Sequence, residues 1–436
     1  MKSNPSKNKN SNIRSILLAS ILILEISGLV YWFLGNYSST PFVIANPVVV
    51  NGSDHVSFAQ HSPKDKNAAL AFTQLRYIEK NFVTPAIKKK FQVKYEICHV
   101  GELTSETIQQ LESWLVNTKV RDLSALIKNE MSFGSEWSKR VGRFFSGWSD
   151  IPFFQGYPCK PMCLSTMTHT DHVMLVDDDL CFLANPLELL LSDEYKEYGN
   201  VLFRDRVEYG NEFVPFIYQV FIPEFVVKYI HNKDPYYVRK SIELRQHILN
   251  NIQQINETDW VGESALVLMN ARKLEEALKI LQHIHKPNIR NQIYSKSWGD
   301  KETFWLSVVL SGHTPFFSPF GMQILGLKRN EEMCQEYFVL VQYLSTGQFK
   351  GTNILYVNGL GIENILSAHP KRLKALRSRY KYVSFPDPQL GHQVGLCRPF
   401  TQCRKFDDAV FDVAIKELNN YSYIFHSSVV NTSSSA

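Results

Sequence analysis

A short apolar strand that runs directly into three carboxylates restricts how this chain can fold. The stretch from Asp171 to Leu191 reads DHVMLVDDDLCFLANPLELLL. Its four consecutive apolar residues, VMLV, predict a strand that is buried on both faces, as in sheets covered by helices on both sides. Ligands of such sheets bind beyond the carboxyl ends of the strands, so the acidic triplet 177–179 is expected to lie at a binding site.

Other apolar runs alternate with helical patterns along the chain. Residues 93–100, 201–203 and 265–269 predict further strands, whereas residues 105–115 and 274–281 carry apolar residues at helical spacing. Helices between buried strands predict an α/β fold with a mostly parallel sheet flanked by helices. The hydrophobic fraction of 44% supplies enough apolar material for a substantial core, which excludes a generally disordered chain.

The outer two carboxylates of the acidic triplet suit a metal ion. Side chains alternate along an extended strand, so Asp177 and Asp179 are expected on one side and Asp178 on the other. Two converging carboxylates bind a hard divalent cation such as Mn²⁺ or Mg²⁺, which can neutralise a diphosphate leaving group. Acidic triplets also form solvated turns or helix caps. The buried strand before this triplet and the Asn185-Pro186 turn after it favour a binding site.

The same stretch resembles a known enzyme family. LVDDDLCFLANPLELL is similar to the D-x-D tract of GT-A glycosyltransferases, in the form found in fungal MNN-type α-mannosyltransferases, glycosyltransferase family 71. Three later stretches resemble this family in the same order, namely FRDR at 203–206, GESALVLMN at 262–270 and GDKETFWL at 299–306. The resemblance spans roughly residues 90 to 365 and implies a GT-A type, Rossmann-like fold.

The resemblance also implies an activity. It is retaining α-mannosyl transfer, α-1,3 or α-1,2, from GDP-mannose to a hydroxyl of a glycan or glycoprotein acceptor, with Mn²⁺ or Mg²⁺ as cofactor. On this mapping Asp177 and Asp179 bind the metal, and Asp178 belongs with them to the donor-binding tract. Arg204 could meet a phosphate while Asp205 orients sugar hydroxyls, although a structural Arg-Asp ion pair is the alternative.

Three further carboxylates are candidates for the chemistry. A retaining transfer needs an acid at the reacting face of the sugar, and the resemblance points to Glu263, Asp300 and Glu302 for this role. The alternatives are a buried hydrogen-bonding role for Glu263 and a helix-start carboxylate for Asp300. Phe304 and Trp305 lie inside the following helical pattern and are expected in the core.

The sequence departs from the family pattern in two places. No His-containing stretch precedes residues 354–359, so a third metal ligand is not evident, and no clear nucleotide-binding turn precedes the first strand. Alternatives therefore stay open: the same fold with a UDP-sugar donor, or a catalytically inactive luminal glycan-binding or scaffold protein. A metal-dependent phosphohydrolase would need more His or Asp at metal spacing.

The N-terminal residues predict a membrane anchor. Basic residues precede an apolar stretch at 16–34 that is long enough to cross a bilayer, with aromatic residues at its end. The positive-inside rule then predicts a cytosolic tail (1–15), a transmembrane signal anchor (16–34), a stem (35–65), a luminal glycosyltransferase domain (66–425) and a polar tail (426–436). With the resemblance this implies a single-pass, type II protein of the Golgi membrane, and a cleaved signal peptide is the alternative.

Charge and cysteine content bear on partners and compartment. The net charge of +5 lies largely in the N-terminal tail, so no nucleic-acid partner is expected. Seven cysteines in a luminal chain permit disulfides, with Cys159–Cys163 and Cys397–Cys403 as local pairs, while Cys98 and Cys181 are interpreted as small buried hydrophobes. Five Asn-x-Ser/Thr sequons would permit glycosylation and begin at Asn36, Asn51, Asn256, Asn420 and Asn431.

Overall fold

The structure is a computed structural model of the whole chain. It describes residues 48–50, 57–59, 64–90, 93–130, 158–205, 216, 262–329, 333–335, 340–343, 353–358, 382–384, 403–405, 409, 411–418 and 420–421, apart from residues 102, 115–116, 169, 178–179 and 298. The expected cytosolic tail, membrane anchor and polar tail lie outside these residues, as do Asp178 and Asp179. Within the described ranges, no helix has the length and apolar character needed to cross a membrane.

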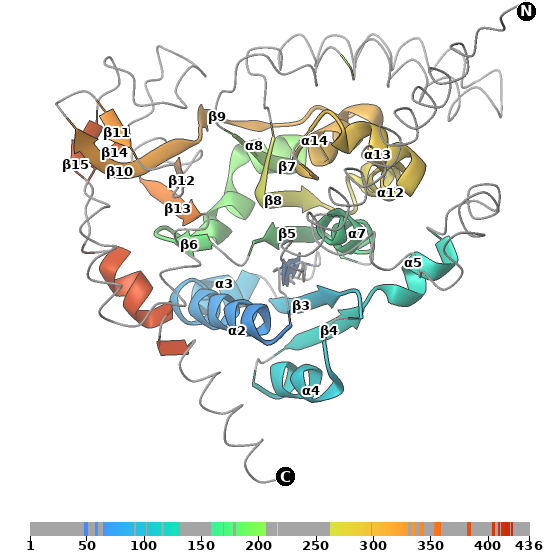
Figure 1. Cartoon of the computed structure of the whole chain (residues 1–436), viewed down its shortest axis with the longest axis horizontal. Helices are drawn as coiled ribbons and strands as arrows, with labels where there is room; N and C mark the ends of the chain where they lie inside the picture. The colour runs from blue at the N-terminus through green and yellow to red at the C-terminus, as the bar shows by residue number, and fades with distance from the viewer. Residues whose placement is uncertain are drawn as a thin grey trace, which may run out of the picture. The chain divides into compact units, whose positions relative to one another are not determined.

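A mixed sheet forms the centre of the described structure (Figure 1). In spatial order the strands are β4 (Thr118–Asp122), β3 (Lys94–His99), β1 (Val48–Val50), β5 (His172–Val176), β8 (Glu263–Asn270), β7 (Asn200–Arg204) and β9 (Phe317–Gly321), with β2 (Ser57–Ala59) beside β5. Strand β5 runs antiparallel to β8, and β8 runs antiparallel to β7, whereas the pairs β3/β4, β2/β5 and β7/β9 are parallel.

The α/β class is confirmed, and the first sheet is mixed. Of its eight described strands, β2, β3, β4, β5, β7 and β9 run in one direction, whereas β1 and β8 run in the opposite direction. A continuous apolar run indicates burial on both faces and says nothing about strand direction, so the sequence pattern could not identify β8 as a reversed strand.

A second, antiparallel sheet begins where the acidic triplet ends. Its strands are β15 (Cys403–Lys405), β14 (Tyr382–Ser384), β10 (Gln323–Arg329), β12 (Leu340–Tyr343), β13 (Ile354–Asn358) and β6 (Leu180–Phe182), with β11 (Met333–Gln335) beside β10. Strand β5 of the first sheet ends at Val176 and β6 begins at Leu180. The acidic triplet therefore connects a strand of one sheet to a strand of the other.

Helices surround these sheets. They are α2 (Lys64–Asn81), α3 (Pro85–Lys90), α4 (Ser105–Trp114), α5 (Ser124–Glu130), α7 (Cys159–Ser165), α8 (Asp193–Tyr198), α12 (Glu275–Ile284), α13 (Pro287–Tyr294) and α14 (Lys301–Leu310), with a 3-10 helix, η2 (Pro186–Leu191). The predicted Asn185-Pro186 turn starts η2, because the Asn185 side chain accepts a hydrogen bond from the Leu187 amide and Pro186 occupies the first helical position.

The core covers both faces of the central sheet. Met174 and Val176 of β5 pack into a cluster with α2 and β6, whereas Val173 and Leu175 pack into a second cluster with α7, α12 and α14. The alternation follows from the two-residue period of a strand. Asp177 comes next after Val176, and its contacts described below lie on the side of α7 and α14.

One disulfide links the sheet to α7. Cys98 of β3 is bonded to Cys163 of α7, and the two residues are 65 positions apart in sequence. The expected pair Cys159–Cys163 is therefore wrong, because α7 packs on β3 and brings Cys163 to a distant partner. Cys98 is buried in the core, as interpreted from the sequence, but as half of a disulfide. Cys159 and Cys181 are buried, which confirms the prediction for Cys181. Cys397 of the other expected pair lies outside the described residues.

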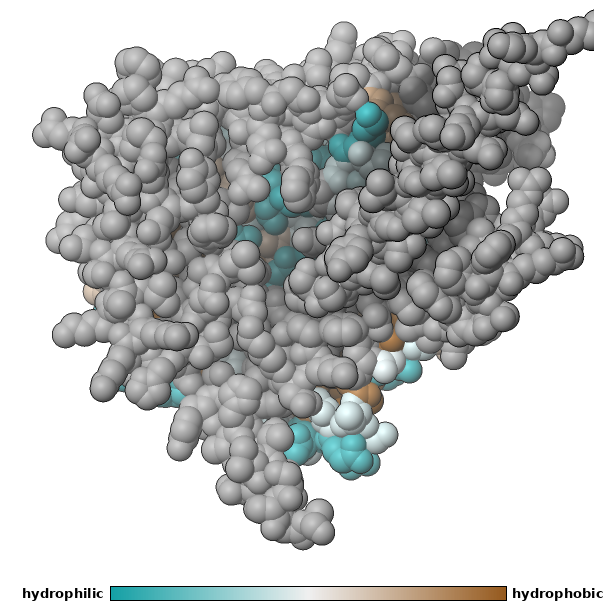
Figure 2. Space-filling view, viewed as in Figure 1, coloured by the Kyte–Doolittle hydropathy of each residue, from teal (hydrophilic) through white to brown (hydrophobic). Residues whose placement is uncertain are grey.

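The described surface is largely polar. Hydrophilic residues account for much of the coloured area on the face shown in Figure 2. Among the described residues, the exposed large hydrophobic side chains are Leu191 and Val413. Isolated exposed hydrophobic residues are normal on soluble surfaces, so neither residue indicates an interface.

Candidate active site

Strand order brings three chain segments to one edge of the central sheet. Both β5 and β7 run antiparallel to β8, so their carboxyl ends lie beside the first residues of β8. Asp177 follows β5, Asp205 follows β7, and Glu263 begins β8. The candidate residues of three separate sequence stretches therefore meet at the edge where ligands of α/β sheets bind.

A buried lysine connects two of the predicted carboxylates. The ammonium group of Lys160 in α7 donates a hydrogen bond of 2.6 Å to Asp177 Oδ2 and lies 3.9 Å from Asp300 Oδ2. Ser264 completes the connection, because its hydroxyl accepts from Lys160 at 3.3 Å and donates to Asp300 Oδ1 at 3.1 Å. Lys160 is 2% exposed and Asp300 is fully buried, so these charges interact with little screening by water.

A second lysine connects two other candidates. Lys301 donates a hydrogen bond to Asp205, and its ammonium group lies 3.9 Å from Glu263 Oε2. Glu263 Oε1 accepts hydrogen bonds from the backbone amides of Ser264 and Ala265, at 2.9 and 2.8 Å. Glu263 thus has the buried hydrogen-bonding role that was considered as the alternative, while its other oxygen faces Lys301.

The two acids of the GDKE stretch have different surroundings. Asp300 occupies the N-cap position of α14, but its side chain makes no capping hydrogen bond and contacts Ser264 and Lys160 instead. Glu302 accepts hydrogen bonds from the amide of Gly262, at 3.3 Å, and from the indole N–H of Trp305. Asp300 therefore belongs to a charged cluster, whose members are Lys160, Asp177, Asp205, Glu263, Ser264, Asp300 and Lys301. Glu302 instead connects α14 to the start of β8 by a hydrogen bond.

Arg204 contacts an aromatic ring. Its guanidinium carbon lies 5.2 Å from the centre of the Phe317 ring of β9, and the residue is 9% exposed. Phe304 and Trp305 are each 1% exposed, which confirms that they are core residues rather than open platforms for a sugar.

Burial dominates the electrostatics of the cluster. Loss of water raises the pKa of Asp177 to about 6, although the neighbouring Lys160 acts in the opposite direction. Burial also raises the pKa of Asp300 and of Glu263 above their ordinary values, and that of Glu302 to about 7. Two lysines thus face four carboxylates, so negative charge is in excess when all are ionised.

Burial and neighbouring charges also act in opposite directions on the pKa of Lys160. Burial by itself would lower the pKa of this ammonium group, but the carboxylates of Asp177 and Asp300 outweigh it, and the net effect is a raised pKa. Lys160 therefore remains a cation inside the protein.

The cluster has oxygens that suit a divalent cation. Asp177 Oδ1 and Asp300 Oδ2 are buried and accept no hydrogen bond from the described residues. Buried carboxylate oxygens normally have a partner, and excess negative charge with oxygen ligands suits Mn²⁺ or Mg²⁺. In the described part of the chain, no three His, Cys, Asp or Glu side chains group as a metal site by themselves. Asp179, the other expected ligand, lies outside it.

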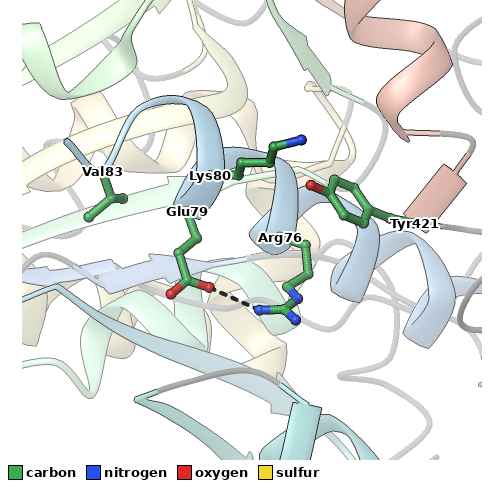
Figure 3. A pocket seen from close by; sticks show the side chains of 5 residues that line it. All are labelled: Arg76, Glu79, Lys80, Val83 and Tyr421. Carbon is green, nitrogen blue, oxygen red and sulfur yellow. Dashed lines mark ion pairs between the residues drawn. The ribbon is translucent and has the colours of Figure 1, made fainter.

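A separate hollow lies on α2 (Figure 3). Its volume is about 450 Å³, and it is lined by Arg76, Glu79, Lys80, Val83 and Tyr421. Arg76 pairs with Glu79 at 3.5 Å, and Lys80 pairs with Glu417. Opposite charges are matched within this hollow and it contains none of the candidate residues, so it is not the candidate active site.

Sequence reasoning missed three members of the charged cluster. Lys160 lies in the apolar stretch CKPMCLS, and a lysine amid buried residues is itself a signal of a paired internal charge. Ser264 and Lys301 lie inside the family-like stretches, each next to a predicted acid. Their roles depend on contacts between separate segments, which the stretches themselves do not indicate.

Comparisons with known proteins identify a family. The model of a family described as "Mannosyltransferase putative" matches residues 95–358, more than half of the chain, and this range contains every candidate residue. The chain is also 24% identical over 320 residues to a Candida albicans protein named "Putative alpha-1,3-mannosyltransferase MNN15". That match covers 66% of this chain and 39% of the relative, so the chain corresponds to about two fifths of the relative's length.

Proposed function

Because this chain belongs to the mannosyltransferase family matched over residues 95–358, we propose that it transfers mannose from GDP-mannose to a hydroxyl of a glycan. The transfer retains the anomeric configuration and forms an α-1,3 or α-1,2 linkage. One observation carries this proposal: carboxylates from four segments, the ends of β5 and β7 and the starts of β8 and α14, surround Lys160 and Lys301 at one edge of the sheet. Burial raises the pKa of three of these acids, Asp177, Glu263 and Asp300, and such a concentration of perturbed acids is typical of a catalytic site.

The donor diphosphate is assigned to the Asp177 side of the cluster. Asp177, with Asp179, would hold Mn²⁺ or Mg²⁺, and the unpaired oxygen Asp177 Oδ1 supports this assignment. When bound, the cation supplies charge neutralisation for the departing nucleoside diphosphate. Asp178 and Arg204 would contribute further contacts to the donor, because a guanidinium group binds phosphate oxygens well.

Asp300 is the acid assigned to the reacting sugar. Its buried oxygen Oδ2 accepts no hydrogen bond from the described residues, and burial raises its pKa toward the range useful for proton transfer at neutral pH. It could accept the proton of the incoming hydroxyl or stabilise positive charge at the sugar. Glu263 and Asp205 share Lys301 and are assigned to sugar hydroxyls, while Glu302 is assigned to holding β8 against α14.

Fold type and location form part of the same proposal. We assign the domain to the GT-A type and place it in the Golgi lumen, behind a single N-terminal anchor. Disulfides persist in oxidising compartments such as the secretory pathway, so the Cys98–Cys163 bond supports a luminal domain.

A panel of sugar nucleotides tests the proposal. The detergent-solubilised full chain is incubated with GDP-mannose or UDP-sugars and simple mannosides, with and without Mn²⁺, and the transferred sugar is measured. We expect transfer only from GDP-mannose and only with the metal. Asp177→Asn should lower kcat by a factor on the order of 100 or more, whereas Asp193→Asn, a change at a 96% exposed carboxylate, should leave it unchanged.

Three results would contradict this assignment. Transfer from a UDP-sugar would keep the glycosyltransferase class but change the donor. Inactivity of the wild-type chain with every donor, combined with binding of a glycan, would favour the scaffold alternative. Full activity of Asp177→Asn would remove the proposed role of the acidic triplet.

A further inference from the structure

Lys160 occupies an unusual position between the two carboxylates with the most important proposed roles. It contacts Asp177 at 2.6 Å and lies 3.9 Å from Asp300, and these acids come from different elements, the end of β5 and the start of α14. The Ser264 hydroxyl, from β8, contacts both Lys160 and Asp300. One ammonium group thus connects four segments of the chain.

The helix that carries Lys160 is held in place independently of the cluster. Every residue of α7 is buried, and Cys163, one turn after Lys160, is bonded to Cys98 of β3. A short helix that is packed on all sides and covalently attached one turn away leaves its lysine little freedom to move. The packing and the disulfide of α7 therefore restrict where the Lys160 ammonium group can lie.

This arrangement also determines which oxygen of Asp177 is available. Lys160 binds Oδ2, whereas Oδ1 is buried and accepts no hydrogen bond from the described residues. In Asp300, Oδ1 accepts from Ser264, whereas Oδ2 lies 3.9 Å from the Lys160 ammonium group and accepts no hydrogen bond from the described residues. Each acid therefore has one oxygen that accepts a hydrogen bond inside the cluster and one oxygen that accepts none there.

We propose that Lys160 is a positioning residue of the transfer reaction, which holds Asp177 and Asp300 close to one ammonium group and leaves Asp177 Oδ1 and Asp300 Oδ2 without a hydrogen bond from the described residues. This inference rests on the proposed function, because it assigns the two acids to the donor and to the reacting sugar. Without the ammonium group, two buried negative charges would lack their shared counter-ion, and the acids would turn away from one another or take up protons. We call this arrangement, in which the Lys160 ammonium group contacts both Asp177 and Asp300, the Lys160 bridge. It accounts for how two carboxylates can lie close together inside the protein.

Four forms of the full chain test the proposal: Lys160→Met, Asp300→Asn, the double variant, and Met162→Leu as a control in the same buried helix. Methionine keeps an unbranched side chain of similar length but removes the charge and the hydrogen bonds that the ammonium group donates to Asp177 and Ser264. Urea unfolding measures stability, and initial rates measure kcat and the KM for the acceptor. Unfolding needs no enzyme activity, so it tests the bridge even if the chain transfers no mannose.

The bridge predicts that the two substitutions change the urea midpoint in opposite directions when they are made one after the other. Lys160→Met should lower the urea midpoint, and adding Asp300→Asn should raise it again, because one uncompensated buried charge is removed. If the lysine only fills space, the double variant should be less stable than Lys160→Met. If Lys160→Met does not fold, the double variant decides the question. A folded double variant would support the bridge. An unfolded double variant, together with a folded Asp300→Asn variant, would overturn it.

The kinetic data test the positioning role. We expect Lys160→Met to lower kcat by a factor on the order of 100 with little change in the acceptor KM, because misplaced groups slow the reaction more than they weaken binding. Met162→Leu should leave both constants near the wild-type values. If the wild-type chain is active and Lys160→Met keeps its kcat, the positioning role is wrong while the proposed function stands.

Discussion

Replacing Gly262 by alanine should slow the proposed mannosyl transfer by separating β8 from α14. A Cβ atom at this position would lie 2.5 Å from the carbonyl oxygen of Lys301 and 3.1 Å from its carbonyl carbon. Ordinary contacts between such atoms begin at about 3.5 Å, so β8 and α14 must move apart by roughly 1 Å. The obstacle is the backbone of a helix, which cannot rotate aside as a flexible side chain can.

The displaced residues belong to the charged cluster. Lys301 contacts Asp205 and Glu263, and the Gly262 amide donates to Glu302. Crowding of a packed interior costs about 1–3 kcal/mol. A misplacement of about 1 Å at a catalytic site can cost a factor on the order of 100 in rate. We therefore expect a moderate loss of stability together with a large loss of kcat.

Gly199→Ala is a matched control for this experiment. Gly199 ends α8 with a φ of 73°, and a Cβ atom there would meet the side chain of Lys273 at 2.8 Å. The left-handed backbone should cost about 1 kcal/mol, but the position lies at the far end of β7 from the cluster. Urea unfolding and initial rates are measured for both variants. Unchanged kcat and stability in Gly262→Ala would refute the close packing of Gly262 against the Lys301 carbonyl group. An equal loss of kcat in Gly262→Ala and Gly199→Ala would indicate general destabilisation.

Other features of the fold give measurable consequences. Replacing both Cys98 and Cys163 by alanine should lower the free energy of unfolding by about 4 kcal/mol, because the bond closes a loop between positions 65 residues apart; a similar midpoint with and without the bond would contradict this. The pKa of Glu302 is raised from 4.5 to about 7 by burial, so its contribution to stability is present below pH 4.5 and is lost as the pH rises through 7. Between pH 4.5 and 7, the unfolding free energy of Glu302→Gln should fall by up to about 3 kcal/mol less than that of the wild-type chain. An equal fall in both would argue against the raised pKa of Glu302. Asn185→Ala should lower the unfolding free energy by about 1 kcal/mol, since it removes the cap of η2, and a loss of kcat would be unexpected.

Local elements were well predicted from the sequence. The strand expected at 93–100 is Lys94–His99, the helix expected at 105–115 is Ser105–Trp114, and the strand before the acidic triplet is His172–Val176. Apolar periodicity suffices for these elements, because burial of one helix face or of a whole strand leaves a local pattern. The family resemblance is confirmed by the match over 95–358, since several short stretches in a fixed order identify a family better than any one of them.

The candidate site was predicted in part. The predicted acids do gather at one edge of the central sheet: Asp177 and Asp300 share Lys160, Asp205 and Glu263 share Lys301, and Glu302 accepts a hydrogen bond from the Gly262 amide. The sequence did not indicate that Glu302 would bind Gly262 and Trp305, since this depends on how α14 packs on β8.

The sequence alone determined the family, the buried strands and the acids at their ends, because these depend on residues that are close together in the chain. Only the tertiary structure decided the direction of β8, the Cys98–Cys163 bond and the position of Lys160 between two carboxylates. Each of these joins segments that are at least 17 residues apart in the chain, and their proximity arises from the packing of the sheet and its helices. A local pattern of apolar and charged residues carries no information about such partners.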